Sequence, residues 1–170
     1  RITAEACVHH LYFDQRDYAD KGALIKCNPA IKRPEDREAL LGAVAEDRID
    51  VIATDHAPHT LEEKAGKYFQ APAGLPLVQD ALPSLFAHVQ AGKLTLEQLV
   101  HKTSHAPAEC FNVQERGYIR EGYWADLVLV DASKPVTRSR EQVLYKCGWS
   151  AFEGRELPAT VVATIVTGEG

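Results

Sequence analysis

Several features that would point to a particular class of function are absent from this sequence. Its 170 residues contain no methionine and only four cysteines, none of them in a CxxC pair. This spacing argues against a disulfide framework and against a cysteine-based zinc site, and it favours the reduced thiols of a cytoplasmic protein. The net charge of −5 offers no basic surface for a nucleic-acid partner.

Long apolar runs and common nucleotide-binding motifs are absent as well. No stretch approaches the ~20 apolar residues that span a bilayer, so no membrane partner is expected. The first ten residues lack the layout of a signal peptide, and the missing initiator methionine indicates a start inside a longer polypeptide. Neither GxGxxG, GxxxxGK[ST] nor a GxSxG elbow occurs.

The hydrophobic pattern of the first third predicts an α/β protein. Residues 2–7 and 23–27 are short β-prone runs, and residues 34–46 are predicted to form a helix. This helix starts with a proline, has acidic residues in its first turn and carries an apolar stripe. Residues 49–53 follow as a buried strand of the parallel type. Strand, helix and strand in this order predict a βαβ unit.

The remainder of the chain divides into a helical part and a β-rich part. After a long loop at residues 60–76, helices are predicted over residues 77–91, 96–102 and 104–111. Beyond residue 112, β-prone runs at 117–119, 125–130 and 159–166 are separated by Gly, Pro and Asp. We therefore expect residues 1–113 to form one domain and residues 114–170 a smaller β-rich domain.

The segment ATDHAPHT, residues 53–60, carries the strongest functional signal. Asp55 ends a predicted strand, and His56 and His59 follow within four residues. In β/α barrels the chemistry takes place at the carboxyl ends of strands, and an acid with nearby histidines suits a metal-assisted hydrolase. A carboxylate here can bind a divalent metal or transfer a proton, whereas the alternative is a simple turn cap.

Other polar residues have a functional and a structural interpretation. His59 suits a substrate carboxylate, although an isolated loop histidine is usually exposed without a role; His56 receives no role. Asn28 precedes a proline at a predicted strand end, where its amide suits either a substrate or a turn. His9 and His10 are adjacent on a predicted strand and would point to opposite faces, so hydrogen-bonded structural histidines are expected.

Six segments, in sequence order, resemble dihydroorotases of the long bacterial-type class within the amidohydrolase superfamily. They are TAEACVHHLYF (3–13), IKCNPAIKR (25–33), ATDHAPHTLEEK (53–64), APAGLPLVQDALP (71–83), GYWADLVLVD (122–131) and TIVTG (164–168). The resemblance implies the C-terminal part of a metal-dependent (β/α)8 hydrolase barrel, starting near the seventh strand, together with part of the small β domain of amidohydrolases.

This resemblance also implies roles for individual residues. Asp55 would be the last-strand ligand of a binuclear zinc site and the catalytic general base and acid. Asn28 and His59 would bind the substrate, and the backbone of Ala73 and Gly74 would line its ring, although the family often has Phe at the position of Ala73. The other usual metal ligands belong to strands before residue 1, so the chain alone is expected to be inactive.

The function implied is the zinc-dependent, reversible cyclisation of N-carbamoyl-L-aspartate to dihydroorotate in pyrimidine synthesis. A homodimer, or a complex with another enzyme of that pathway, would fit. Two alternatives stay open. One is another cyclic amidase, such as a hydantoinase, dihydropyrimidinase or allantoinase, against which His59 argues. The other is a non-catalytic, dihydroorotase-like structural subunit, against which the presence of Asp55, Asn28 and His59 argues.

Overall fold

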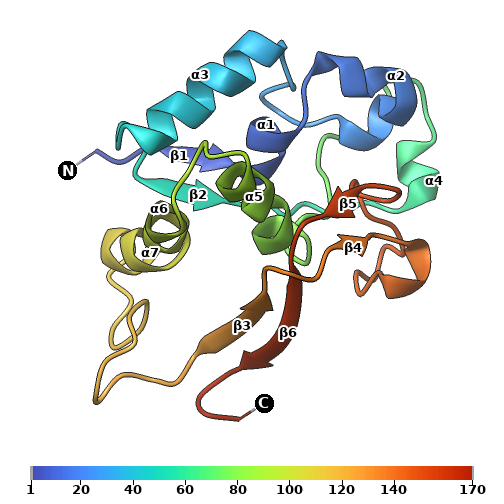
Figure 1. Cartoon of the computed structure of the whole chain (residues 1–170). Coiled ribbons are helices and arrows are strands. Elements are labelled where there is room, and N and C mark those ends of the chain that lie inside the picture. Colours follow the sequence, from blue (N-terminus) through green and yellow to red (C-terminus); the bar gives the residue numbers. More distant parts are fainter. Residues whose placement is uncertain (1, 170) are drawn as a thin grey trace.

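Two short parallel strands lie at the centre of the larger part of the molecule. In the computed structural model, which describes residues 2–169, β1 (Glu5–Cys7) pairs with β2 (Val51–Ala53), and Ala6 lies opposite Ile52. Parallel neighbours require a crossover connection. The longest helix of this connection is α3 (Pro34–Ala45), which lies over the strand pair (Figure 1). A βαβ unit is therefore present, as predicted.

Local sequence explains where α3 begins. Pro34 occupies the first turn, where its missing N–H costs no hydrogen bond. The Asp36 carboxylate accepts a hydrogen bond from the Arg33 amide at 3.1 Å and lies close to the positive end of the helix. Leu41 and Val44 are buried against the core. The helix predicted over residues 34–46 is confirmed to within one residue at its end.

Residues 23–27 do not form the predicted strand. The 3₁₀ helix Gly22–Ile25 takes up most of this run, directly after α2 (Tyr18–Lys21). Gly22 has a φ of 49°, which allows the tight turn between the two. Ile25 and Cys27 are buried all the same, and burial alone does not distinguish a short strand from a helical turn. The first strand of the parallel pair is β1.

The segment after β1 is helical too. His9 and His10 lie in α1 (Val8–Tyr12), which follows β1 without a break, rather than on a strand. The two residues therefore do not point to opposite faces of a sheet, and their ring centroids lie 4.1 Å apart. A 3₁₀ turn, Gln15–Asp17, connects α1 to α2.

Helices in the middle of the chain start at different residues from those predicted. The predicted loop at 60–76 contains α4 (Leu61–Lys64), and α5 (Ala81–Gln90) begins at residue 81 rather than 77. Further on, α6 (Leu96–Val100), the π-helical turn His101–His105 and α7 (Ala106–Cys110) form one continuous helix. The separate helix predicted to start at Ser104 is therefore wrong, because the chain does not leave the helix there.

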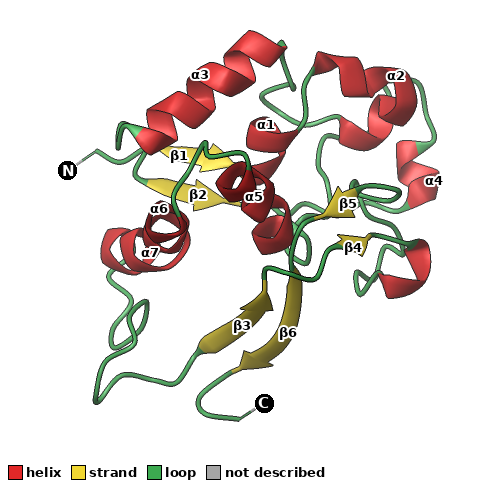
Figure 2. Cartoon of the chain, viewed as in Figure 1, coloured by secondary structure: helices red, strands yellow, loops and turns green. Residues whose placement is uncertain are grey.

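The strands of the last third form two further pairs. An antiparallel ribbon joins β3 (Leu127–Asp131) to β6 (Thr160–Ile165), with a bulge at Leu129/Val130, and β4 (Val136–Thr137) pairs with β5 (Glu156–Leu157). The 3₁₀ helix Arg140–Gln142 lies between β4 and β5. Figure 2 shows the β3–β6 ribbon extending away from the helices. The strands predicted near 125–130 and 159–166 are confirmed, whereas residues 117–119 form none.

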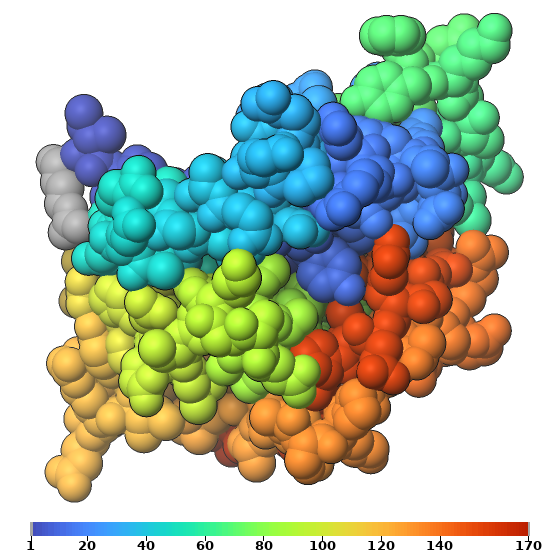
Figure 3. Space-filling view, turned by 45° about the horizontal axis from the view of Figure 1, so that its top comes forward, coloured from blue at the N-terminus to red at the C-terminus, as the bar shows by residue number. Residues whose placement is uncertain are grey.

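The hydrophobic core joins the two ends of the sequence. Trp149, Phe152 and Leu157 belong to the same buried cluster as the apolar residues of α1 and α3. The Phe152 ring lies 4.8 Å from Tyr12 and 5.1 Å from Phe13, between ring centroids. Burial of each such side chain contributes roughly 1.5–3 kcal/mol. Figure 3 shows the C-terminal segment, in red and orange, lying directly against the blue and yellow-green parts.

Within residues 2–169 the strands make three two-stranded sheets rather than a closed barrel. None of the helices in this range has the length and apolar character that crossing a membrane requires.

Candidate active site

Asp55 lies just beyond the carboxyl end of β2, as predicted. Its φ is 49°, a left-handed conformation that residues other than glycine rarely adopt. Among those residues Asp is one of the more tolerant, and such conformations gather at functional sites. The backbone therefore turns sharply after Thr54 and exposes the Asp55 carboxylate at the end of the strand pair.

A cavity of ≈ 490 Å³ runs along β1 and the first half of α3, and Asp55, just beyond β2, lies on its wall. Asp55 and Asn28 both line it, so the structure brings together two residues that sequence analysis selected separately. Asn28 precedes a cis peptide bond to Pro29. Three basic and three acidic side chains line the same cavity, namely Lys32, Arg33 and Arg37 with Glu5, Asp36 and Asp55, and Arg33 is paired with Asp36.

His59 lies next to the segment that contains Ala73 and Gly74. Its Nε2 lies 3.2 Å from the Ala73 carbonyl oxygen, so this nitrogen carries the proton and donates. Its Nδ1 lies 3.6 Å from the Glu63 carboxylate. The His59 carbonyl accepts a hydrogen bond from the Trp149 indole at 2.7 Å. The Nε2 contact thus orients the imidazole, and the His59 backbone is fixed from the C-terminal segment.

Gly74 is the point of closest approach between this segment and the ATDHAPHT loop. Its φ is 137°, and an added Cβ would lie 2.5 Å from the Ala57 oxygen and 3.1 Å from His59 Cδ2. Only glycine fits both requirements. The Gly74 amide donates to the Lys26 carbonyl at 2.9 Å, two residues before Asn28. The predicted residues therefore form two groups, with Asp55 and Asn28 in the cavity and His59, Ala73 and Gly74 packed together beside them.

His56 has a structural role that sequence analysis did not assign. Its Nδ1 accepts hydrogen bonds from the amides of Leu77 at 2.9 Å and Val78 at 3.2 Å. The Ala57 amide donates to the Leu75 carbonyl at 3.0 Å. His56 therefore fixes the chain that follows Gly74. No local sequence signal indicates this contact, because its partners lie about twenty residues away.

Cys7, His9 and His10 form a group of metal-ligating side chains at the carboxyl end of β1. Their ligand atoms lie within 4.8 Å of one another, and Cys7 and His10 also line the cavity with Asp55. His10 Nε2 lies 2.8 Å from the Pro29 carbonyl, which confirms the expected structural bond for this histidine. The group depends on the tight turn from β1 into α1. The short spacing C-x-H-H was its only sequence signal.

His9 differs from its neighbour. It is fully buried, and neither ring nitrogen has a hydrogen-bond partner within the described residues, although the Thr54 carbonyl lies near enough to influence it. Burial lowers the pKa of His9 to about 3, with His10 acting in the same direction. The imidazole is therefore neutral, which is the form that binds metals. Burial, reinforced by Asp55, raises the pKa of the Cys7 thiol to about 11.

Dihydroorotases are among the known proteins similar to this chain. The dihydroorotase of Halobacterium salinarum is 41% identical over 152 residues, covering 89% of this chain and 36% of the relative. That of Clostridium acetobutylicum is 38% identical over 169 residues, covering 99% of this chain and 40% of the relative. The chain thus spans about two fifths of the length of these relatives, and the resemblance to dihydroorotases is confirmed.

Solved structures give the same fold. The L-hydantoinase (dihydropyrimidinase) from Arthrobacter aurescens superposes with a TM-score of 0.91 at 26% identity, covering 98% of this chain and 38% of that one. The dihydropyrimidinase from Brevibacillus agri NCHU1002 superposes with a TM-score of 0.89 at 25% identity, with the same coverage. The model of the amidohydrolase family matches residues 5–169, and this chain therefore belongs to the amidohydrolase family.

Proposed function

We propose that the protein carrying this chain is a dihydroorotase, which interconverts N-carbamoyl-L-aspartate and dihydroorotate in the cytoplasm. Residues 1–113 would contribute the last strands and helices of a (β/α)8 barrel, and residues 114–170 part of the small β domain. The observation that carries the proposal is the cavity beside β1 that is shared by Asn28 and by Asp55, which follows the carboxyl end of β2. Similarity to dihydroorotases at 38–41% identity supports the choice of substrate.

The donor atoms around this cavity suit zinc. A carboxylate oxygen of Asp55 and neutral imidazole nitrogen are both ordinary zinc ligands. The buried, unpartnered nitrogens of His9 are the kind of atom that a cation would satisfy. We propose that Asp55 holds the metal together with ligands from other parts of the protein. When bound, zinc would polarise the amide carbonyl and lower the pKa of water.

Asp55 would also carry the proton transfer. In ring opening its carboxylate would take up a proton from the attacking water and deliver it to the leaving ring nitrogen, with the reverse sequence in cyclisation. The left-handed turn at Asp55 exposes the carboxylate to the cavity, where a substrate can reach it. Asn28, which lines the same cavity, would donate its amide N–H to a substrate oxygen.

His59 would bind the substrate's carboxylate, and the backbone at Ala73–Gly74 would line the ring. Its Nε2–H is engaged by the Ala73 carbonyl oxygen, which orients the imidazole beside the backbone that would line the ring. Zinc-dependent hydrolysis of hydantoins or dihydropyrimidines is the second candidate, because the solved relatives named above carry those names. Those substrates belong to the same chemical class of cyclic amides but do not need a carboxylate-binding histidine.

The test compares substrates and variants in the complete protein. We expect turnover of dihydroorotate and N-carbamoyl-L-aspartate but not of hydantoin or dihydrouracil. Asp55→Asn should lower kcat by at least about 100-fold, the usual scale for a lost general acid or base. His59→Ala should raise KM while zinc content stays unchanged.

His88→Gln serves as the control, because His88 lies outside the cavity and should leave both constants unchanged. Turnover of hydantoin in preference to dihydroorotate would favour the second candidate. Unchanged kcat in Asp55→Asn would refute the role given to Asp55. Absence of all turnover with zinc bound would favour a non-catalytic subunit, either in a homodimer or with another pyrimidine enzyme.

A further inference from the structure

Lys64 is a buried lysine whose ammonium group contacts the segment beside His59. It lies at the end of α4 and is only 2% exposed. Its Nζ donates hydrogen bonds to the carbonyl oxygens of Pro72 and Gly74, both at 2.9 Å, and more weakly to that of Lys26 at 3.3 Å. All three acceptors are main-chain carbonyls, so the ammonium group organises backbone.

A buried ammonium group is costly to maintain. Burial lowers the pKa of Lys64 to about 8, and the nearby Lys26 lowers it further, while Cys27 opposes the shift. An apolar side chain of similar length could fill the same space without this penalty. What an apolar residue cannot do is attract several carbonyl dipoles to one point. The property that a lysine adds at this position is therefore control over the orientation of those peptide groups.

Peptide planarity converts these contacts into a defined backbone arrangement. The C=O and N–H of one peptide group point in opposite directions. With the Pro72 carbonyl directed at Lys64, the Ala73 N–H points away from the ammonium group. The next carbonyl, that of Ala73, faces His59 Nε2 at 3.2 Å, and the following one, that of Gly74, returns to Lys64. The carbonyls of Pro72 and Gly74 thus contact the lysine, and the carbonyl of Ala73 between them contacts the histidine, so the backbone at Ala73 is held from both sides.

We propose that Lys64 is a positioning residue of the substrate site. Its ammonium group fixes the peptide planes on both sides of Ala73, holds the Ala73 carbonyl against His59, and presents the Ala73 N–H on the side opposite the lysine. It acts through the backbone and touches no substrate. This inference rests on the proposed function, in which His59 and the backbone at Ala73–Gly74 bind the substrate.

The test uses Lys64→Met and Lys64→Gln in the complete protein, with Lys67→Met as the matched control. Lys67 belongs to the same segment but is exposed. Met removes all donors, whereas Gln keeps a neutral donor. Two readouts are measured: amide hydrogen exchange over residues 71–77, and KM and kcat for dihydroorotate. The first is independent of activity.

We expect Lys64→Met to speed exchange over residues 71–77 at least ten-fold and to raise KM at least ten-fold, with kcat changed less than three-fold. Lys64→Gln should give intermediate values of both, and Lys67→Met should match the unmodified protein. Exchange and KM within two-fold of the unmodified protein in either folded Lys64 variant would overturn the proposal.

The two proposals fail in different ways. If the unmodified protein does not turn over dihydroorotate, the proposed function fails, and exchange alone still decides whether Lys64 orders residues 71–77. If Lys64→Met does not fold, Lys64→Gln provides the same comparison with a smaller change. A rise in KM without faster exchange would contradict action through the backbone, because the lysine would then contact the substrate itself.

Discussion

At the scale of single residues, the absence of a Cβ at Gly74 determines how closely its segment approaches the loop of Ala57 and His59. Gly74 packs against Ala57 and His59 at distances that leave no room for a Cβ. Its φ of 137° would also strain any other residue. The contact between the Ala73 carbonyl and His59 depends on this approach.

We expect Gly74→Ala to lower the free energy of unfolding by about 1–3 kcal/mol, through backbone strain and overpacking. Urea unfolding measures this change in the free energy of unfolding. Gly42→Ala is the matched control, because Gly42 lies in α3 with no atom within 4 Å of an added Cβ. That change should raise stability by roughly 0.5–1 kcal/mol through its helix propensity. Equal effects at both positions would show that the close approach at Gly74 is unimportant.

His88 on α5 makes stability depend on pH. Burial lowers the pKa of its imidazole from 6.5 to about 4, with Arg37 and Lys93 acting in the same direction and Glu38 opposing them. The folded pKa lies below the unfolded value, so between pH 6.5 and 4 the unfolded chain binds a proton that the folded protein does not. Stability should therefore fall on acidification through this range.

The contribution of His88 to that slope is at most about 1.4 kcal/mol per pH unit, the value for one proton. Urea midpoints for His88→Gln and the unmodified protein, measured from pH 7 to pH 4, give the comparison. We expect the curve of the variant to be flatter between pH 6.5 and 4. Parallel curves would mean that His88 is protonated equally in the folded and unfolded states.

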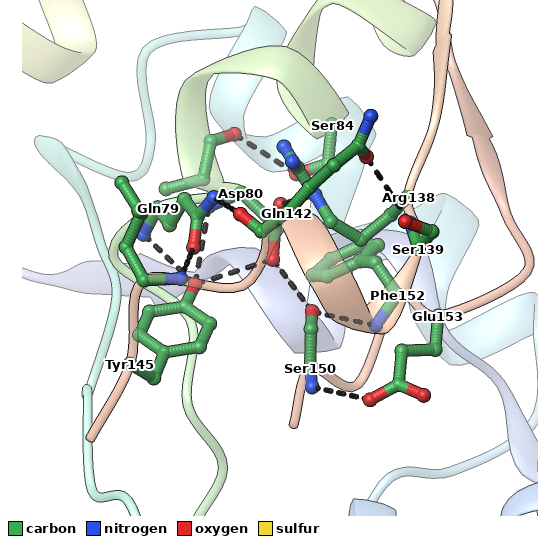
Figure 4. A network of polar contacts seen from close by, with 12 residues as sticks. Gln79, Asp80, Ser84, Arg138, Ser139, Gln142, Tyr145, Ser150, Phe152 and Glu153 are labelled. Atoms are coloured by element: carbon green, nitrogen blue, oxygen red, sulfur yellow. Dashed lines mark hydrogen bonds and ion pairs between the residues drawn. The ribbon is translucent and has the colours of Figure 1, made fainter. Parts of the chain in front are cut away.

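At the scale of elements, a buried polar network joins the start of α5 to the C-terminal segment. The Asp80 carboxylate is fully buried and accepts hydrogen bonds from Arg138 Nε at 2.6 Å, Ser150 Oγ at 2.6 Å and the Tyr145 hydroxyl at 3.2 Å (Figure 4). Tyr145 also accepts from the Gln79 amide at 2.8 Å. The Asp80 carboxylate thus connects the start of α5 with Arg138, Tyr145 and Ser150, which lie 58, 65 and 70 residues further along the chain.

Asp80→Ala should cost about 3–5 kcal/mol, because it leaves the Arg138 guanidinium buried without its partner. The control is Glu38→Gln, which breaks the exposed pair between Glu38 and Lys93 at 2.7 Å. That change should cost at most about 1 kcal/mol. Chemical denaturation measures both, and a similar cost for the two variants would argue that the Asp80 network is no stronger than a surface pair.

Elements with local determinants could be predicted from the sequence, and those fixed by distant packing could not. The helix at 34–46 has its own start signal and apolar stripe. The strand predicted at 49–53, which forms over Val51–Ala53, is apolar apart from Asp50. Residues 23–27 carry an apolar run without either distinguishing feature, and burial in the core stabilised a 3₁₀ turn there. The π-helical turn His101–His105 likewise left no local signal, so a helix start at Ser104 was predicted instead.

The same distinction applies to the candidate site. Asp55 and Asn28 were predicted because each ends or follows an apolar run, and both line the cavity. The group of Cys7, His9 and His10 was missed, because a strand was expected where α1 begins. Lys64 was missed as well, since nothing local to it indicates that carbonyls from residues 26, 72 and 74 converge on its ammonium group.

At the scale of the whole molecule, the first and last segments share one core. Phe152 packs on Tyr12 and Phe13, and the Asp80 network adds a polar connection between the start of α5 and the C-terminal segment. The proposed division between residues 113 and 114 therefore separates segments that share buried surface. The β3–β6 ribbon, in contrast, exposes Val128, Leu129 and other apolar side chains.

The indole of Trp149 is a fluorescent reporter of the site. It is 1% exposed, and its Nε1 donates directly to the His59 carbonyl. The other tryptophan of these 170 residues, Trp124, is about half exposed and lies near Arg116. Excitation of Trp149 therefore samples the peptide group of His59, and after Trp124→Phe it is the single tryptophan that these 170 residues contribute to the emission. A ligand that displaces His59 would change the colour or intensity of that emission, which gives an unlabelled optical assay of occupancy.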